Sequence, residues 1–152
     1  MNNDFCKCIS LSDVDTLTIG NCNCKNYIDE IIDTFVKIKI TKIKLIKGKS
    51  NQYVYITGCK IIKIHYITND CTGLIRSTTF LEPFNTHFSI DSCIKDLSIC
   101  DYYVNLLCKE YDIICDDSLS FSTFYEICIK FDTKIIMPDD CFSECYDSLD
   151  CP

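Results

Sequence analysis

The chain has little of several residue types that most folded domains use. Among its 152 residues there is no alanine and no tryptophan, and there are four glycines, three prolines and one arginine. The missing alanine, together with abundant isoleucine, threonine, tyrosine and phenylalanine, disfavours helices and favours strands. A net charge of −7 argues against nucleic acid as a partner, because phosphate binding requires a basic surface. We therefore expect an all-β protein that does not bind nucleic acid.

Segments that direct a chain to a membrane are also lacking. No apolar run approaches the length that spans a bilayer, and the N-terminus has no basic region followed by an apolar stretch. We expect neither membrane insertion nor a secretory signal. The 14 cysteines conflict with this expectation, because thiols made in a cytosol stay reduced unless they hold metal or meet an oxidant later. Both explanations remain open at this point.

The cysteines crowd toward the two ends of the chain. With 47% hydrophobic residues, the chain can bury a core without disulfide staples, so we expect the thiols to serve durability or assembly. The terminal thiols are our candidates for disulfides between subunits: Cys6, Cys8, Cys22, Cys24, Cys141, Cys145 and Cys151. The other disulfide candidates are Cys59, Cys71, Cys93, Cys100, Cys108, Cys115 and Cys128.

Two C-x-C pairs, Cys6 with Cys8 and Cys22 with Cys24, bear on this choice. In an extended chain their Cα atoms lie about 6.5–7 Å apart, at the upper limit for a disulfide within the pair. Each pair is therefore more comfortable bonding outward, to a neighbouring subunit or to thiols of its own domain. The same four thiols could instead form a zinc or iron–sulfur site, although structural zinc sites favour longer spacers.

Signals for catalysis are missing. No C-x-x-C occurs, and the two histidines, His65 and His87, come without a recognisable oriented base or oxyanion hole. The acid pairs Asp116-Asp117 and Asp139-Asp140 lack the oxygen spacing of a calcium loop and are typical of turns. We expect no enzyme activity, no catalytic residue and no cofactor.

The pattern of apolar residues predicts three regions: an extended N-terminal arm over 1–26, a domain over 27–138, and an acidic tail over 139–152. Ile28, Ile31, Ile32 and Phe35 share one helical face, which predicts a short helical turn over 27–35. The remainder predicts an antiparallel β-sandwich of about seven to nine strands. Those strands are expected at 36–47, 52–68 with an interruption at Gly58, 74–81, 87–90, 102–108, 110–115 and 121–136.

Two further irregularities stand out. The apolar parity slips near Thr41-Lys42, which predicts a β-bulge. Charge is uneven as well, because Thr34 to Asn69 holds eight lysines and no acid, whereas five acids and no base follow Lys134. This asymmetry is consistent either with solvated faces or with head-to-tail attraction between subunits.

An ordered series of short motifs runs through the first half of the expected domain: Lys25 to Ile32, the strand Val36 to Ile46, the turn Lys47-Gly48-Lys49, Gly58, Tyr66 and Pro83-Phe84. In this order and spacing the stretch resembles the SPOCS domain of clostridial spore coat and spore morphogenesis proteins. Two features depart from that pattern, because Cys22 to Asn26 replaces the usual flanking prolines and no second copy or peptidoglycan-binding repeat follows.

The resemblance implies a β-rich building or docking module of the spore envelope, made in the mother cell and exposed to air after lysis. Our hypothesis is a self-assembling structural protein of the bacterial spore surface, in the coat, the exosporium or an appendage filament. Its partners are copies of itself, joined head to tail and locked by disulfides, and other spore coat or exosporium proteins. The alternatives are a monomeric adaptor that recruits coat proteins and a cysteine-ligated metal module.

Overall fold

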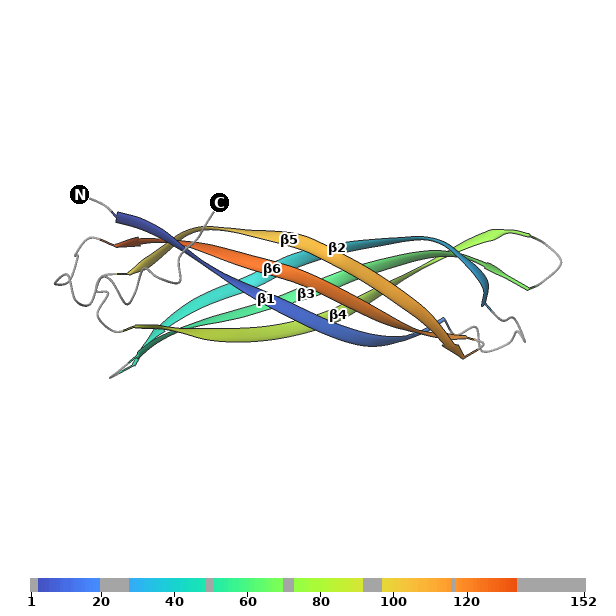
Figure 1. Cartoon of the computed structure of the whole chain (residues 1–152), viewed down its shortest axis with the longest axis horizontal. Coiled ribbons are helices and arrows are strands. Elements are labelled where there is room, and N and C mark those ends of the chain that lie inside the picture. The colour runs from blue at the N-terminus through green and yellow to red at the C-terminus, as the bar shows by residue number, and fades with distance from the viewer. Residues whose placement is uncertain are drawn as a thin grey trace.

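The computed structural model describes residues 3–19, 28–48, 51–69, 73–91, 97–115 and 117–133. These ranges contain six long strands and no helix. The strands are β1 (Asn3–Thr18), β2 (Ile28–Lys47), β3 (Asn51–Thr68), β4 (Ile75–Asp91), β5 (Ser98–Cys115) and β6 (Ser118–Thr133). They run along an elongated body as two twisted layers (Figure 1).

Each layer is a three-stranded antiparallel sheet. The strand order is β1-β6-β5 in one sheet and β2-β3-β4 in the other. The chain crosses between the sheets twice, after β1 and after β4. β1 and β6 therefore share a sheet, and they pair along their whole length from Asn3 opposite Thr133 to Thr18 opposite Ser118. The expectation of an all-β antiparallel sandwich is therefore confirmed.

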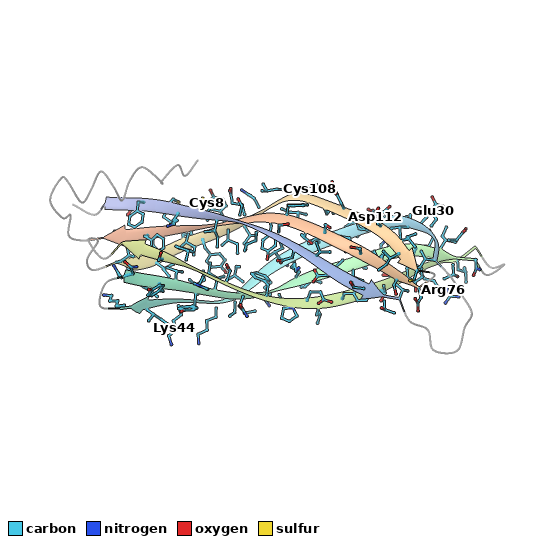
Figure 2. All side chains as sticks on the ribbon, turned by 60° about the horizontal axis from the view of Figure 1, so that its bottom comes forward. Cys8, Glu30, Lys44, Arg76, Cys108 and Asp112 are labelled. Carbon is cyan, nitrogen blue, oxygen red and sulfur yellow. A yellow bond between two sulfur atoms is a disulfide. The ribbon has the colours of Figure 1, made fainter. Side chains whose placement is uncertain are left out.

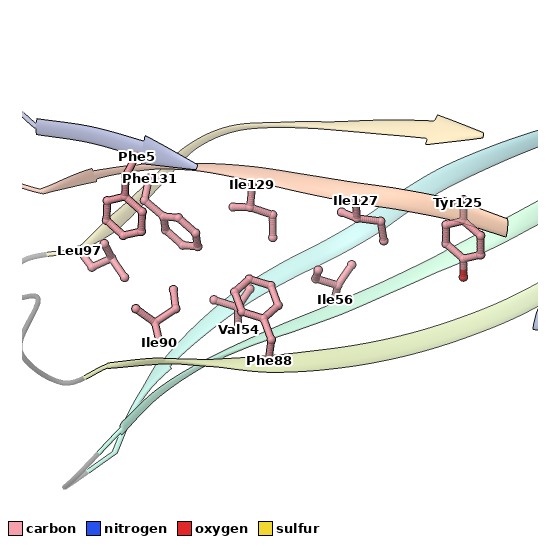
Figure 3. Close-up of a cluster of buried hydrophobic side chains, with 10 residues drawn as sticks. All are labelled: Phe5, Val54, Ile56, Phe88, Ile90, Leu97, Tyr125, Ile127, Ile129 and Phe131. Carbon is pink, nitrogen blue, oxygen red and sulfur yellow. The ribbon is translucent and has the colours of Figure 1, made fainter. Parts of the chain in front are cut away.

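The core lies between the two central strands, β3 and β6. Along β3 the even-numbered residues from Gln52 to Thr68 are all buried, and along β6 the odd-numbered residues from Leu119 to Phe131 are buried. Such strict alternation is what a strand with one face toward a core requires. The buried side chains form two clusters, and Figure 3 shows the larger one, in which Phe5 and Phe88 pack against Phe131.

The helical turn expected over 27–35 is wrong, since β2 begins at Ile28. Register shifts between Ile28 and Glu30 and between Ile31 and Asp33 insert one extra residue each. Ile28, Ile31 and Thr34 consequently face the core together, opposite inward residues of β3. Two bulges in a strand thus imitate the three-residue spacing of a helix.

The described residues form six strands rather than seven to nine. Two expected breaks do not occur, which merges four expected strands into β4 and β5, and β1 adds a strand where an arm was expected. β4 continues through Pro83, which an edge strand tolerates because its outer N–H groups need no partner in the sheet. β5 continues across Lys109 with a register shift between Leu106 and Cys108. β3 likewise passes through Gly58 without interruption.

The N-terminal segment is not an extended arm over residues 3–18, because these residues form β1 and complete a sheet. The expected bulge at Thr41-Lys42 is confirmed by a register shift between Ile40 and Lys42. The acidic tail 139–152 lies outside the described residues. Within the described ranges, no helix is both long and apolar enough to cross a membrane.

Candidate assembly and cross-linking site

Two of the predicted disulfide cysteines are joined inside the chain. Cys8 of β1 and Cys128 of β6 are directly opposite in the sheet register, with Cα atoms 4.0 Å apart, and form a disulfide. Cys8 was predicted to reach a neighbouring subunit, but in this structure it closes a loop of its own chain. Cys6 is also disulfide-bonded. The remaining terminal candidates, together with Cys71 and Cys93, lie outside the described residues: Cys22, Cys24, Cys141, Cys145 and Cys151.

Four described cysteines are free: Cys59, Cys100, Cys108 and Cys115. The last three lie on β5 and are exposed, whereas Cys59 lies on β3 and is half-buried. Cys100 lines a groove of about 390 Å³ between β2 and β5. Cys108 and Cys115 pair in register with Phe124 and Ser118, so they share the outer face of the β1-β6-β5 sheet.

β5 is an edge strand with an unusual surface. All but two of its 18 residues are exposed, whichever face of the sheet they lie on. Among them are seven large apolar or aromatic side chains, including Leu107 at 59% exposure: Tyr102, Tyr103, Leu106, Leu107, Tyr111, Ile113 and Ile114. Contiguous exposed apolar surface of this kind marks an interaction site or an aggregation hazard.

The charges of β5 are mostly acidic. Asp101, Glu110 and Asp112 lie on the same outer face as Cys108, as their register with β6 shows. Figure 2 shows Cys108 and Asp112 pointing away from the sandwich. The one base of the strand, Lys109, points the other way and donates to the carbonyl of Thr34 on β2.

The outer face of the other sheet is basic. Lysines of β2 pair with the outward residues of β3, and Lys39 lies directly opposite the free Cys59. The lysines on this face are Lys37, Lys39, Lys42, Lys44 and Lys63. In Figure 2, Lys44 lies on the side of the molecule away from Cys108. A thiol among lysines and thiols among acids therefore occupy opposite sides of one sandwich.

The two histidines lie on this basic sheet, each against an aromatic ring. His65 contacts Phe35 edge-on with ring centroids 5.4 Å apart, and His87 stacks on Tyr55 at 5.4 Å. Both therefore contribute to cross-strand aromatic packing.

A cluster of charged residues lies inside the sandwich, between the two apolar clusters. Lys60 of β3 is 1% exposed, and its Nζ lies 2.5 Å from Oδ2 of Asp15 and 3.0 Å from Oδ2 of Asp13, both on β1. The hydroxyl of Tyr125 donates to the same oxygen of Asp13 at 2.7 Å. Burial, and then the neighbouring carboxylates of Asp13 and Asp15, raise the pKa of Tyr125 well above its usual value.

Sequence reasoning did not single out this cluster, although a signal was present. Lys60 interrupts the inward alternation Val54, Ile56, Ile62, Ile64 of β3, so its ammonium falls on the buried face. Asp13 and Asp15 hold the corresponding inward positions of β1. A charge at an inward position of an apolar strand indicates a buried partner of opposite sign.

One group of side chains has the composition of a metal site. Sγ of Cys8, Sγ of Cys128 and a carboxylate oxygen of Glu126 all lie within 4.8 Å of one another. Thiolates bind zinc only when they are reduced, so the disulfide between Cys8 and Cys128 and a metal ion exclude each other. Cys22 and Cys24, two of the thiols that the C-x-C hypothesis would gather, lie outside the described residues.

The fold and these surfaces define a cysteine-bearing β-sandwich with one acidic and one basic thiol-containing face. A scan against protein-family models finds no matching family, and searches of curated proteins and of solved structures find no match either. The function must therefore be inferred from the arrangement of the residues themselves.

Proposed function

We propose that this protein is a self-assembling structural protein that polymerises through contacts between β-sandwiches and is then locked by disulfides between subunits. The observation that carries the proposal is β5, an edge strand that is exposed along its length, apolar, and equipped with three free exposed cysteines. A monomer gains nothing by holding this surface in water, whereas a neighbouring subunit would bury it.

Complementary charge supports a head-to-tail arrangement. The outer face of β5 carries Asp101, Glu110 and Asp112, and the outer face of β2 and β3 carries five lysines. These are the outer faces of opposite layers. When the acidic face of one subunit stacks on the basic face of the next, the stack still presents a free basic face at one end and a free acidic face at the other. Heterologous contacts of this kind generate open polymers rather than closed dimers.

The free thiols fit the same stacking. Cys108 and Cys115 project from the acidic face, and Cys59 lies on the basic face opposite Lys39. Oxidation of Cys59 with Cys108 or Cys115 of the next subunit would fix each contact covalently. The cross-link would follow non-covalent docking, as required of thiols that are made in a reducing cytosol and oxidised after lysis.

The spore surface, as coat, exosporium or appendage filament, is our proposed location because of the resemblance to SPOCS domains. Two residues of that resemblance, Gly58 and Phe84, lie against each other in the sheet. A Cβ added at Gly58 would lie 2.5 Å from Cζ of Phe84 and 2.6 Å from the carbonyl oxygen of Lys39, so the ring of Phe84 requires glycine there. Immunogold labelling of sporulating cells tests the location. Label that stays in the cytoplasm and never reaches the surface of mature spores would refute it.

Assembly is tested with purified chain that is freed of reductant, oxidised in air and run on a non-reducing gel. Wild type should give a ladder that collapses to monomer with reductant. Cys59→Ser and the double variant Cys108→Ser/Cys115→Ser should each remove most of the ladder. Cys100→Ser is the matched control, because Cys100 lines the groove between β2 and β5 rather than the outer face. A wild-type monomer without reductant would refute the proposal and favour the monomeric adaptor.

A charge-swap experiment tests the pairing of faces. Lys37→Glu/Lys39→Glu should weaken assembly, and so should Glu110→Lys/Asp112→Lys, because each places like charges across the contact. Mixing the two variants should restore alternating polymer. If the mixture of the two variants does not assemble, even at low salt, these two faces do not meet.

A further inference from the structure

We propose that Lys60 and Asp15 form a covalent amide bond, so that the sandwich closes itself with an internal isopeptide cross-link between β3 and β1. The observation is the contact between a buried lysine amine and an aspartate carboxylate on another strand, with a second carboxylate touching the same amine. This inference is independent of the assembly proposed above, because every participating residue lies within one chain.

The reacting groups are already placed by the fold. Nζ of Lys60 lies 2.5 Å from Oδ2 of Asp15, at the short end of the range for a charge-assisted hydrogen bond. Lys60 and Asp15 belong to different sheets, and each is held by a ladder of backbone pairing. Such preorganisation replaces a bimolecular encounter and can be worth many powers of ten in rate.

The surroundings favour the amide over the separated ions. Lys60 is 1% exposed and lies between the apolar cluster of Ile62 and Phe121 and that of Ile56 and Tyr125. Burying a charged pair costs desolvation that its mutual attraction recovers only in part. Condensation removes one positive and one negative charge from the interior and leaves a neutral amide in their place.

Asp13 is placed to carry the protons. Its Oδ2 lies 3.0 Å from Nζ of Lys60 and accepts the hydroxyl hydrogen of Tyr125 at 2.7 Å. Tyr125 therefore holds this carboxylate at a fixed position beside the amine. Glu82 of β4 is the register partner of Lys60 on the other side and is half-buried.

The reaction balances without any added reagent. The Lys60 ammonium first transfers a proton to Asp15, which gives a neutral amine beside a carboxylic acid. The nitrogen lone pair attacks the Asp15 carboxyl carbon and forms the C–N bond. Asp13 accepts a proton from that nitrogen and returns it to the departing hydroxyl, so the C–O bond breaks and water leaves. The sum is ammonium plus carboxylate giving amide plus water, with no oxidation or reduction.

The released water has a path outward. The side chains of Asp13 and Asp15 are 30% and 18% exposed, whereas that of Lys60 is 2% exposed. The carboxyl side of the pair therefore borders solvent while the amine side remains within the core.

The primary test is the intact mass of the folded wild-type chain after complete reduction and alkylation. We expect a mass one water lower than that of the sequence with every cysteine alkylated. After trypsin, the tryptic peptide 8–25 should be joined to peptide 50–63, with no cleavage after Lys60 because its amine is acylated. Fragmentation should place the link on Asp15.

Variants separate the reaction from the ion pair. Lys60→Arg and Asp15→Ala should restore the full sequence mass. Lys63→Arg, a change at an exposed lysine three residues away on the same strand, should retain the lost water. Asp13→Asn should slow linkage by about a hundredfold or more, the usual contribution of a positioned proton carrier. Far-ultraviolet circular dichroism confirms that each variant is folded.

Three outcomes would overturn the proposal. A wild-type mass equal to that of the fully alkylated sequence, in freshly made and in aged protein, would show an ion pair only. A lost water confined to a single tryptic peptide would indicate a cyclic imide at an aspartate. A link from Lys60 to Asp13 or Glu82 would refute the assignment of Asp15 as the acyl group.

Discussion

The disulfide between Cys8 and Cys128 should be a major source of stability. The bond joins residues separated by 120 positions, so it constrains nearly the whole unfolded chain. With a loop of that length, chain-entropy theory gives about 5 kcal/mol at 25 °C. An isopeptide link between Lys60 and Asp15 would shorten the loop by roughly a third, which lowers this figure by a few tenths of a kcal/mol because the dependence is logarithmic.

The double variant Cys8→Ser/Cys128→Ser tests this value by urea unfolding, with circular dichroism as the probe and the free thiols blocked. We expect the free energy of unfolding to fall by about 3–5 kcal/mol. Part of that fall could come from a hydroxyl at the fully buried position 128. Wild type unfolded in the presence of a reductant breaks the same bond without adding a hydroxyl. Because the reductant also breaks the disulfide of Cys6, this measurement gives an upper limit for the contribution of the Cys8–Cys128 bond.

Cys115→Ser is the control, because Cys115 is exposed and free and should change stability by less than about 0.5 kcal/mol. A loss under about 1 kcal/mol in both the double variant and the reduced wild type would refute the argument from loop entropy. It would mean that pairing of β1 with β6 already holds the ends of the chain together in the unfolded ensemble.

Three further outcomes follow from particular contacts. Gly58→Ala should lower the free energy of unfolding by about 1–3 kcal/mol in urea titrations, since its Cβ would meet the Phe84 ring. Phe84→Leu in the same chain should recover part of the loss. An unchanged free energy of unfolding in Gly58→Ala would mean that the ring moves freely. Because the pKa of Tyr125 is raised in the fold, its contribution to stability should be constant below about pH 10 and fall above it as the unfolded phenol ionises. Tyr125→Phe should flatten the loss of stability above about pH 10 in melting curves recorded against pH, and an equally steep loss would contradict the assignment. Leu107→Lys should reduce polymer yield in sedimentation while leaving the melting temperature unchanged, and undiminished polymer would remove β5 from the contact.

Local patterns predicted the centre of the fold well. The alternation along 52–68 and 121–136 placed the two central strands and their buried faces, and the slip of parity at Thr41-Lys42 located a bulge. These features depend on neighbours in sequence, where a period of two has a direct physical cause. The helical interpretation of 27–35 failed for the same reason, because two bulges changed the local period.

The candidate site was less predictable, because it depends on which strands meet. The choice of Cys8 as a link between subunits assumed that residues 1–26 leave the domain, whereas β1 pairs with β6 and brings Cys8 opposite Cys128. The exposure of β5 was equally hidden, since its apolar residues resemble those of a buried strand. Pairing across more than a hundred residues leaves no periodic signal in either segment.

The pairing of the first strand with the last has a consequence for the order of events during synthesis. The β2-β3-β4 sheet is built from consecutive hairpins, so it can form while the ribosome is still adding residues. β1 has to wait for β6, which is the last of the described strands, and the surface presented by β5 takes its final shape at the same moment. Under the proposed function, this order of pairing would delay polymerisation until translation of the domain is complete.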